Sequence, residues 1–172
     1  MKSVNHVVLC SKARIPVLVR LTNFSDFAFR VLLFAAARPG RLITIDEIAL
    51  AFDVSRAHLT KVVNTLTQSG YLKAYRGRSG GLALVKPPED INLGDVLRAA
   101  EPDFALVECM RADNRCLLTK TCKLRGPMER ALAAFQAELD RYSLSDIMLS
   151  EAEFPASGGM STTGRSRRSG QD

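Results

Sequence analysis

Residues 54–64 read VSRAHLTKVVN, and this stretch decides the fold that the sequence predicts. Ser55 is a residue type that caps helices at their amino end. Apolar residues then recur at helical spacing on one face, and Gly70 closes the helix. The apolar face consists of Leu59, Val62, Val63 and Leu66. We therefore expect a helix with one buried side and one polar, basic side.

A shorter helix is expected just before it. Thr44 and Glu47 have the spacing of a capping box, in which a hydroxyl and an acid three residues later satisfy each other's backbone N–H groups. This helix runs to Phe52, and Asp53–Val54 predicts a tight turn because Asp tolerates the left-handed backbone conformation. Two short helices joined by a tight turn, the second one basic, are typical of a helix-turn-helix DNA reader.

The flanking segments extend this unit. Apolar spacing predicts a long first helix, capped at Thr22 or Asn23 and ended by Pro39–Gly40. Strands are expected at 71–75 and 82–85, with a glycine-rich tip at 76–81 that makes the hairpin a wing. A short helix at 92–100 and a long helix at 124–142 follow. The predicted fold class is mainly α with a small β-hairpin wing: a winged helix-turn-helix plus a long C-terminal dimerisation helix.

The long helix carries one apolar stripe and a charged opposite face. Its stripe consists of Leu124, Met128, Ala131, Leu132, Phe135, Leu139 and Tyr142. Such spacing suits either the core of one protomer or the seam between two paired helices. We favour the seam, because a small domain has little core left for so long a helix, and we therefore expect a homodimer.

Charge is concentrated in the DNA-reading unit. The net charge is +6, and residues 54–86 contain no Asp or Glu. Six basic residues lie in that segment: Arg56, Lys61, Lys73, Arg76, Arg78 and Lys86. A one-sign segment on a basic chain is typical of a polyanion binder. No apolar run approaches the ~20 residues of a membrane span, and the cysteine content does not suit a secreted disulfide scaffold, so we expect a cytoplasmic protein without a membrane partner.

The candidate DNA contacts lie at two places. Ser55, Arg56, His58 and Lys61 occupy the amino end of the second helix of the motif, the end that enters the major groove. We expect Arg56 to reach guanine edges and Ser55 and Lys61 to hold phosphates, while His58 is equally compatible with a solvated surface position. At the hairpin tip, Arg76, Gly77 and Arg78 suit the minor groove or the backbone. The alternative for the tip is a merely solvated basic hairpin.

A second signal is a polar loop that holds three of the chain's four cysteines. They are Cys109, Cys116 and Cys122, separated by residues 110–115 and 117–121. Thiolates that converge on one point bind iron–sulfur clusters or zinc. Zinc is less expected, because structural zinc sites favour ligand pairs two to four residues apart. A disulfide bond or a chance grouping of cysteines would also account for the pattern. Three thiolates leave one position for a ligand that is not cysteine, and spacing alone does not rank the candidates.

Taken together, these segments resemble the family of winged-helix iron–sulfur transcription regulators. The matching pieces are RLTNFSD at 20–26, VSRAHLTKVVN at 54–64, GYL at 70–72, RGRSGG at 76–81, GDV at 94–96, EP at 101–102 and the three cysteines. The resemblance implies a repressor that binds a double-stranded DNA operator and holds an iron–sulfur cluster, either two-iron (2Fe–2S) or four-iron (4Fe–4S), on Cys109, Cys116 and Cys122.

Within that family the chain is more similar to the nitric-oxide-sensing NsrR-type repressors than to the branch that contains IscR. IscR-type proteins carry a histidine three residues after the third cysteine, where this chain has Arg125. The NsrR-type resemblance implies nitric oxide as the signal and an acid of the partner's first helix as fourth cluster ligand. The matching residue is Asp26, which can also be interpreted as a helix-start acid with no metal role. A redox- or iron-responsive regulator and a metal-free winged-helix protein are the alternatives.

The resemblance also bears on the ends of the chain. Such proteins begin with Met directly before RLT, where this chain has Val19, so we interpret residues 1–18, with Cys10, as an unstructured leader or a mis-assigned start. The regulator domain is expected at 19–148, and the Gly-, Ser- and Arg-rich residues 149–172 are expected to form a disordered tail. An enzyme is not expected, because the only histidines are His6 and His58 and no phosphate loop or catalytic triad is present.

Overall fold

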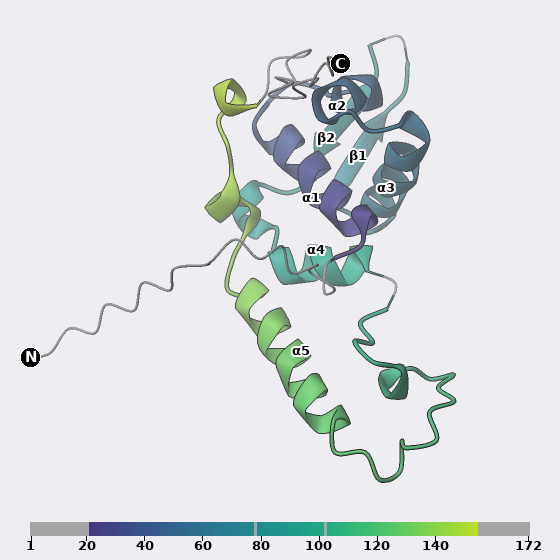
Figure 1. Cartoon of the computed structure of the whole chain (residues 1–172). Helices are drawn as coiled ribbons and strands as arrows, with labels where there is room; N and C mark the ends of the chain where they lie inside the picture. Colours follow the sequence, from purple (N-terminus) through teal and green to yellow (C-terminus); the bar gives the residue numbers. More distant parts are fainter. Residues whose placement is uncertain (1–20, 78, 102, 155–172) are drawn as a thin grey trace, which may run out of the picture.

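A computed structural model describes residues 21–77, 79–101 and 103–154 (Figure 1). The predicted leader, Arg78 of the hairpin tip and the predicted tail from 155 onward lie outside these ranges. The helices and strands are α1 (Asn23–Ala36), α2 (Ile45–Phe52), α3 (Arg56–Gln68), β1 (Leu72–Tyr75), β2 (Gly81–Leu84), α4 (Leu93–Ala100) and α5 (Arg125–Leu139). Short 3-10 turns occupy η1 (Pro88–Asp90), η2 (Glu108–Met110), η3 (Leu144–Ile147) and η4 (Glu151–Glu153). The predicted fold class is confirmed.

Local sequence signals fix the helix-turn-helix. The Thr44 hydroxyl accepts from the backbone N–H of Glu47, and the Glu47 carboxylate accepts from the backbone N–H of Thr44, so the capping box is formed. Asp53 ends α2 with φ 52° and ψ 48°, the left-handed conformation expected there. Ser55 then caps α3 by accepting from the backbone N–H of His58. The motif therefore folds where the sequence predicts it.

The wing is an antiparallel pair in which Leu72 lies opposite Leu84 and Tyr75 opposite Gly81. A third segment joins it, because Ile43 and Leu82 exchange backbone hydrogen bonds of 3.0 and 2.8 Å. A Cβ at Gly81 would lie 2.8 Å from the Ile43 carbonyl oxygen, so this close approach requires glycine. The base of the wing is thereby joined to the segment between α1 and α2.

The hydrophobic core lies where α1, α3 and α4 meet behind the wing. Its largest fully buried side chains include Leu32, Ile48, Leu59, Leu66 and Leu97. Because α1 packs against α3 and α4, the DNA-reading helix and the helix that leads into the cysteine loop share one core.

Helix α5 leaves this body and extends away from it (Figure 1). None of its residues is buried, and Phe135 is 43% exposed. The helix ends at Leu139, short of the predicted 142, where the Asn92 side-chain amide donates to the carbonyls of Asp140 (2.7 Å) and Tyr142 (3.3 Å). Part of the predicted apolar stripe is therefore exposed in the single protomer, at Leu124, Phe135 and Tyr142. Met128 and Leu132 are half-buried, and Leu139 packs against the core.

After α5 the described chain returns to the body. Leu144 is fully buried, and Phe154 is only 8% exposed. The Phe154 ring packs edge-on against Phe34 of α1 and Phe52 of α2, with ring centroids 5.6 and 6.1 Å apart. The described chain therefore extends six residues beyond the expected boundary at 148, and one aromatic side chain of this polar segment takes a buried position.

Candidate nucleic-acid interface and cysteine loop

The predicted DNA contacts of α3 gather on one exposed surface. Ser55, Arg56, His58 and Lys61 are all exposed at the amino end of the helix, while Leu59 and Val62 on the other face are buried. Helix packing thus turns the basic face outward. This arrangement suits insertion of the helix start into a major groove.

Three of these side chains, Ser55, Arg56 and His58, already have partners within the protein. The Arg56 Nε lies 2.9 Å from the Asp46 Oδ1 of α2. The Ser55 hydroxyl lies 3.0 Å from the His58 Nδ1 and also serves as the helix cap. Sequence reasoning missed Asp46. Its position at the start of the preceding helix was the available signal, because the ion pair joins the starts of α2 and α3.

The described part of the hairpin tip is exposed. Arg76 and Gly77 are open to solvent, and Gly77 has φ 116°, a conformation that favours glycine. The backbone N–H of Gly80 donates to the Gly77 carbonyl at 3.0 Å, which closes the turn. Arg76 is therefore exposed next to a turn that this hydrogen bond closes.

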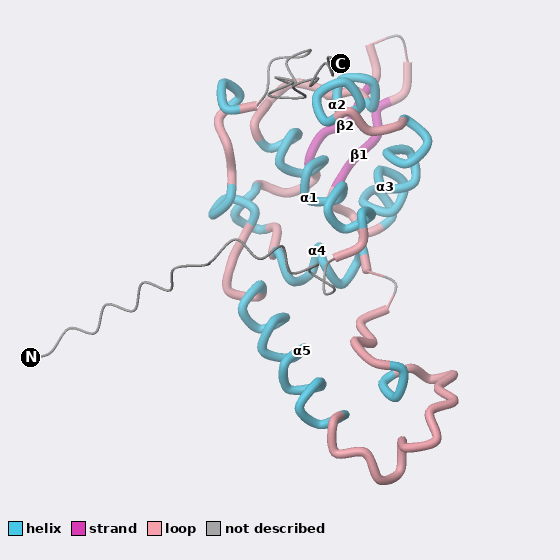
Figure 2. The backbone as a smooth tube through the Cα atoms, in the orientation of Figure 1, coloured by secondary structure: helices cyan, strands magenta, loops and turns pink. Residues whose placement is uncertain are grey.

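The cysteine loop joins α4 to α5 as a long irregular segment that contains η2 (Figure 2). Cys109 is buried, Cys116 and Cys122 are half-buried, and all three are free thiols. Among the described residues, no three His, Cys, Asp or Glu side chains lie close enough together to hold a metal ion. The single chain therefore places the three predicted ligands on one loop without bringing their sulfurs to one point.

Hydrogen bonds within the loop nevertheless give it a defined path. The Glu108 carboxylate accepts from the backbone N–H of Arg115 at 3.0 Å. The Thr119 hydroxyl donates to the Cys116 carbonyl at 2.7 Å, and the Cys122 sulfur accepts from the backbone N–H of Leu124 at 3.4 Å. Three free thiols, one of which already accepts an N–H, are a donor set that fits an iron–sulfur cluster by its chemistry.

Asp26 lies on α1, apart from the cysteines of its own chain. Its carboxylate pairs with Arg30 one turn later at 2.7 Å, and both side chains are half-exposed. The start of α1 is also bound to the segment that enters the loop, because Glu101 accepts two hydrogen bonds from Thr22. A residue that binds a cluster held by a second protomer must be accessible at the surface, and Asp26 on α1 is accessible.

Arg125, which distinguishes this chain from the histidine-bearing branch, opens α5. Its Nε donates to the Glu129 carboxylate at 2.7 Å. That hydrogen bond raises the pKa of Arg125 above its ordinary value. Within this chain the Arg125 side chain is engaged along its own helix.

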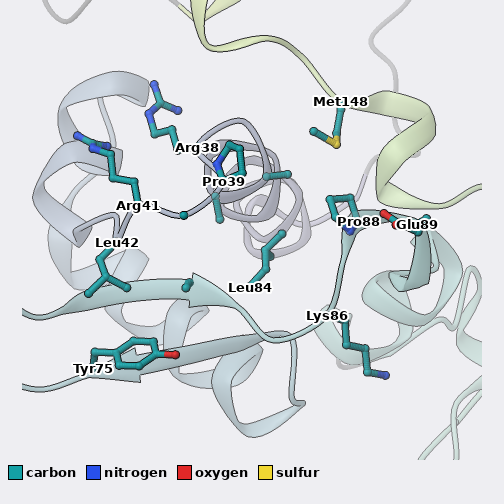
Figure 3. A pocket seen from close by; sticks show the side chains of 14 residues that line it. Arg38, Pro39, Arg41, Leu42, Tyr75, Leu84, Lys86, Pro88, Glu89 and Met148 are labelled. Atoms are coloured by element: carbon teal, nitrogen blue, oxygen red, sulfur yellow. The ribbon is translucent and has the colours of Figure 1, made fainter.

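A surface cavity of about 600 Å³ lies between the end of α1, the wing and η1 (Figure 3). Arg41, Tyr75, Lys86, Glu89 and Met148 are among its lining residues. Of the predicted DNA contacts and cluster ligands that the structure describes, none lines it. The candidate sites are therefore the exposed surface of α3 and the wing, and the loop, rather than this cavity.

The described helices also bear on membrane association. None of the helices within the described ranges is both long enough and apolar enough to span a bilayer.

Known proteins share both the sequence pattern and this geometry. A family model described as "Rrf2: Iron-dependent Transcriptional regulator" matches residues 21–150. The HTH-type transcriptional regulator NsrR of Bacillus subtilis is 46% identical over 132 residues, which cover 76% of this chain and 90% of that protein. The protein of the same name from Geobacillus kaustophilus is 44% identical with the same coverage.

Solved structures show the same fold. A transcriptional regulator from Listeria innocua has a TM-score of 0.60 at 28% identity and covers 74% of this chain and 84% of its own. IscR from T. potens has a TM-score of 0.60 at 20% identity, over 74% of this chain and 85% of its own. CymR, the global cysteine regulator of B. subtilis, has a TM-score of 0.59 at 23% identity, over 75% and 95%.

Proposed function

Because this chain belongs to the Rrf2 family of transcriptional regulators and is a DNA-binding repressor, we propose that it senses nitric oxide through an iron–sulfur cluster. The observation that carries the proposal is the loop between α4 and α5, which bears three free thiols: Cys109, Cys116 and Cys122. The similarity to several NsrR proteins supports the choice of signal. We place the repressor in the cytoplasm, where its DNA partner is.

The DNA-binding form is proposed to be a homodimer. The exposed apolar side chains Leu124, at the start of α5, and Phe135, within it, support this, because exposed apolar positions on a helix favour pairing with a second copy. Each protomer would place the start of α3 and its wing on one half-site of a duplex operator. The half-sites would be separated by about one helical turn, ~34 Å.

The cluster would be held by Cys109, Cys116 and Cys122, with the partner subunit's Asp26 as fourth ligand. When bound, it supplies iron atoms that nitric oxide attacks. The hydrogen bonds from Thr22 to Glu101 join the start of α1 to the loop, and α1 packs against α3. A displaced loop would therefore shift the two DNA-reading helices relative to each other. Small shifts are enough to weaken binding, because both half-sites must be occupied at once.

The test is to purify the full chain without oxygen, record its absorption spectrum, and titrate it with nitric oxide while DNA binding is followed. We expect a coloured protein that releases its operator on titration. Cys116→Ala should be colourless and should no longer repress, whereas Cys10→Ala, outside the loop, should behave as the unchanged protein. A coloured, repressing Cys116→Ala protein would contradict the cluster assignment.

An iron- or redox-responsive regulator is the second candidate, favoured by the description of the matching family as iron-dependent. It predicts release of DNA on iron chelation or oxidation and no response to nitric oxide. A preparation that is colourless, yet binds DNA fully and ignores nitric oxide, would instead indicate a metal-free regulator.

A further inference from the structure

We propose that Asp46 is a positioning residue for DNA recognition, whose carboxylate holds the Arg56 guanidinium in the orientation that reads one guanine. The inference rests on the proposed role of α3 as the DNA reader. It does not depend on the cluster or on its signal.

The ion pair connects the starts of the two helices of the motif. Asp46 is the second residue of α2, and Arg56 is the first residue of α3. Both helix starts are fixed by caps, α2 by its Thr44–Glu47 capping box and α3 by Ser55. The 2.9 Å contact therefore joins two backbone positions that are each defined independently.

Asp46 is the acid that pairs with a predicted DNA contact of α3. The neighbouring Glu47 is occupied otherwise, because it accepts from Thr44 and pairs with Arg41. An exposed carboxylate beside a surface that binds phosphates costs affinity through repulsion. Asp46 would offset this repulsion by holding Arg56, a predicted base contact, in position.

The atoms of the contact favour base reading. A guanidinium has five N–H donors in a planar fork. The Asp46 carboxylate forms its ion pair with Arg56 on the Nε side of this fork. The two terminal nitrogens remain available for the O6 and N7 atoms of a guanine, the paired contact that arginine makes in the major groove. Asp46 thus leaves free the end of the fork that recognises the base.

The expected effect is on recognition rather than on folding. The side chains of Arg56 and Asp46 are 69% and 64% exposed, and ion pairs this exposed contribute little to stability. A long arginine side chain loses rotamer freedom when it contacts a base, and holding it beforehand reduces that loss on binding. Removing Asp46 should therefore reduce discrimination at one base pair and leave the fold intact.

The experiment selects a duplex from a pool with randomised bases using the full-length chain, prepared without oxygen. Binding is then measured for duplexes in which each G·C pair of the selected site is replaced in turn. The variants are Asp46→Asn, Arg56→Lys, Arg56→Ala and the double variant Asp46→Asn/Arg56→Ala. Asp95→Asn is the matched control, because Asp95 is similarly exposed (61%), pairs with Arg98 at 2.7 Å on α4, and is not among the predicted DNA contacts.

We expect the unchanged protein to prefer one G·C pair by about tenfold, and Arg56→Lys to lose that preference because lysine lacks the fork. Asp46→Asn should lower the preference to about threefold or less, and it should have no further effect when Arg56 is already alanine. Asp95→Asn should bind as the unchanged protein does. Melting temperatures should agree within about 5 °C, since all these changes are at exposed positions.

Three results would overturn the inference. One is an Asp46→Asn protein with full preference, and another is an Arg56→Ala protein with full preference. The third is an Asp46→Asn change that tightens binding to every duplex equally in both backgrounds, which would reduce Asp46 to a source of repulsion. If the unchanged protein enriches no sequence at all, the assignment of α3 as the reader fails, and the inference fails with it.

Discussion

Thr22 and Glu101, 79 residues apart in the sequence, are joined by two hydrogen bonds to one carboxylate oxygen. The Thr22 backbone N–H donates at 2.8 Å and its hydroxyl at 3.1 Å. Thr22 caps α1, and Glu101 ends α4 at the point where the chain leaves for the cysteine loop. A single side chain therefore joins the start of the first helix to the start of the loop.

Glu101→Ala should lower the free energy of unfolding by about 1–2 kcal/mol, because it removes two hydrogen bonds to an ionised acceptor. Urea denaturation measures this change. Glu129→Ala is the control, because it breaks only the exposed ion pair between Glu129 and Arg125, one helical turn apart. It should lower the free energy of unfolding by about 0.5 kcal/mol or less. If the two substitutions lower the free energy of unfolding equally, the hydrogen bonds between Thr22 and Glu101 stabilise the fold no more than an exposed ion pair does.

Asp26→Ala should leave the cluster bound, because three thiolates remain, and should change its absorption spectrum and its sensitivity to nitric oxide. Anaerobic spectra and nitric oxide titrations measure both. Arg30→Ala is the control: it removes the residue that pairs with Asp26 at 2.7 Å but keeps the carboxylate, so the band positions should not move. An unchanged spectrum and response in Asp26→Ala would remove this residue from the site.

Lys61→Ala should weaken binding to all duplexes alike and should reduce the slope of log affinity against log salt by about one unit, because one phosphate contact is lost. Binding titrations at several salt concentrations measure the slope. Lys123→Ala, an exposed lysine of the cysteine loop, should leave the slope unchanged. A loss confined to one base position would mean that Lys61 reads sequence.

Phe135→Asp should weaken the dimer by about 3 kcal/mol, roughly a hundredfold, because it places a charge in an apolar seam. Sedimentation equilibrium measures the dissociation constant. Ala137→Asp adds the same charge to an exposed position on the opposite side of α5 and should leave the dimer intact. If Phe135→Asp remains as dimeric as the control, α5 does not form the seam through this face.

The parts of the fold that were predictable depend on residues close together in the sequence. The Thr44–Glu47 capping box, the left-handed Asp53 and the Ser55 cap each involve residues within one helical turn, and all three are confirmed. Contacts between distant segments were missed for the same reason. The bridge between Ile43 and Leu82 has no local signature, because it depends on how the wing folds back.

The candidate sites divide in a similar way. Residue type and spacing predict an exposed Arg56 at the start of α3, and it is exposed there. Its ion pair with Asp46 arises only when two helices pack. The three cysteines are conspicuous in the sequence because a polar loop rarely concentrates thiols. Among the residues the structure describes, their sulfurs do not converge in one protomer, and spacing along a loop cannot predict whether they do.

The position of Phe154 determines where another protein can be attached to this one. A fluorescent reporter fused directly after Met148 would leave Phe34 and Phe52 without the ring that packs against them and would also omit Glu151, the residue that pairs with Arg38 at 3.0 Å. A reporter attached beyond Phe154 keeps those contacts. Labelled versions for imaging should therefore retain the chain through residue 154.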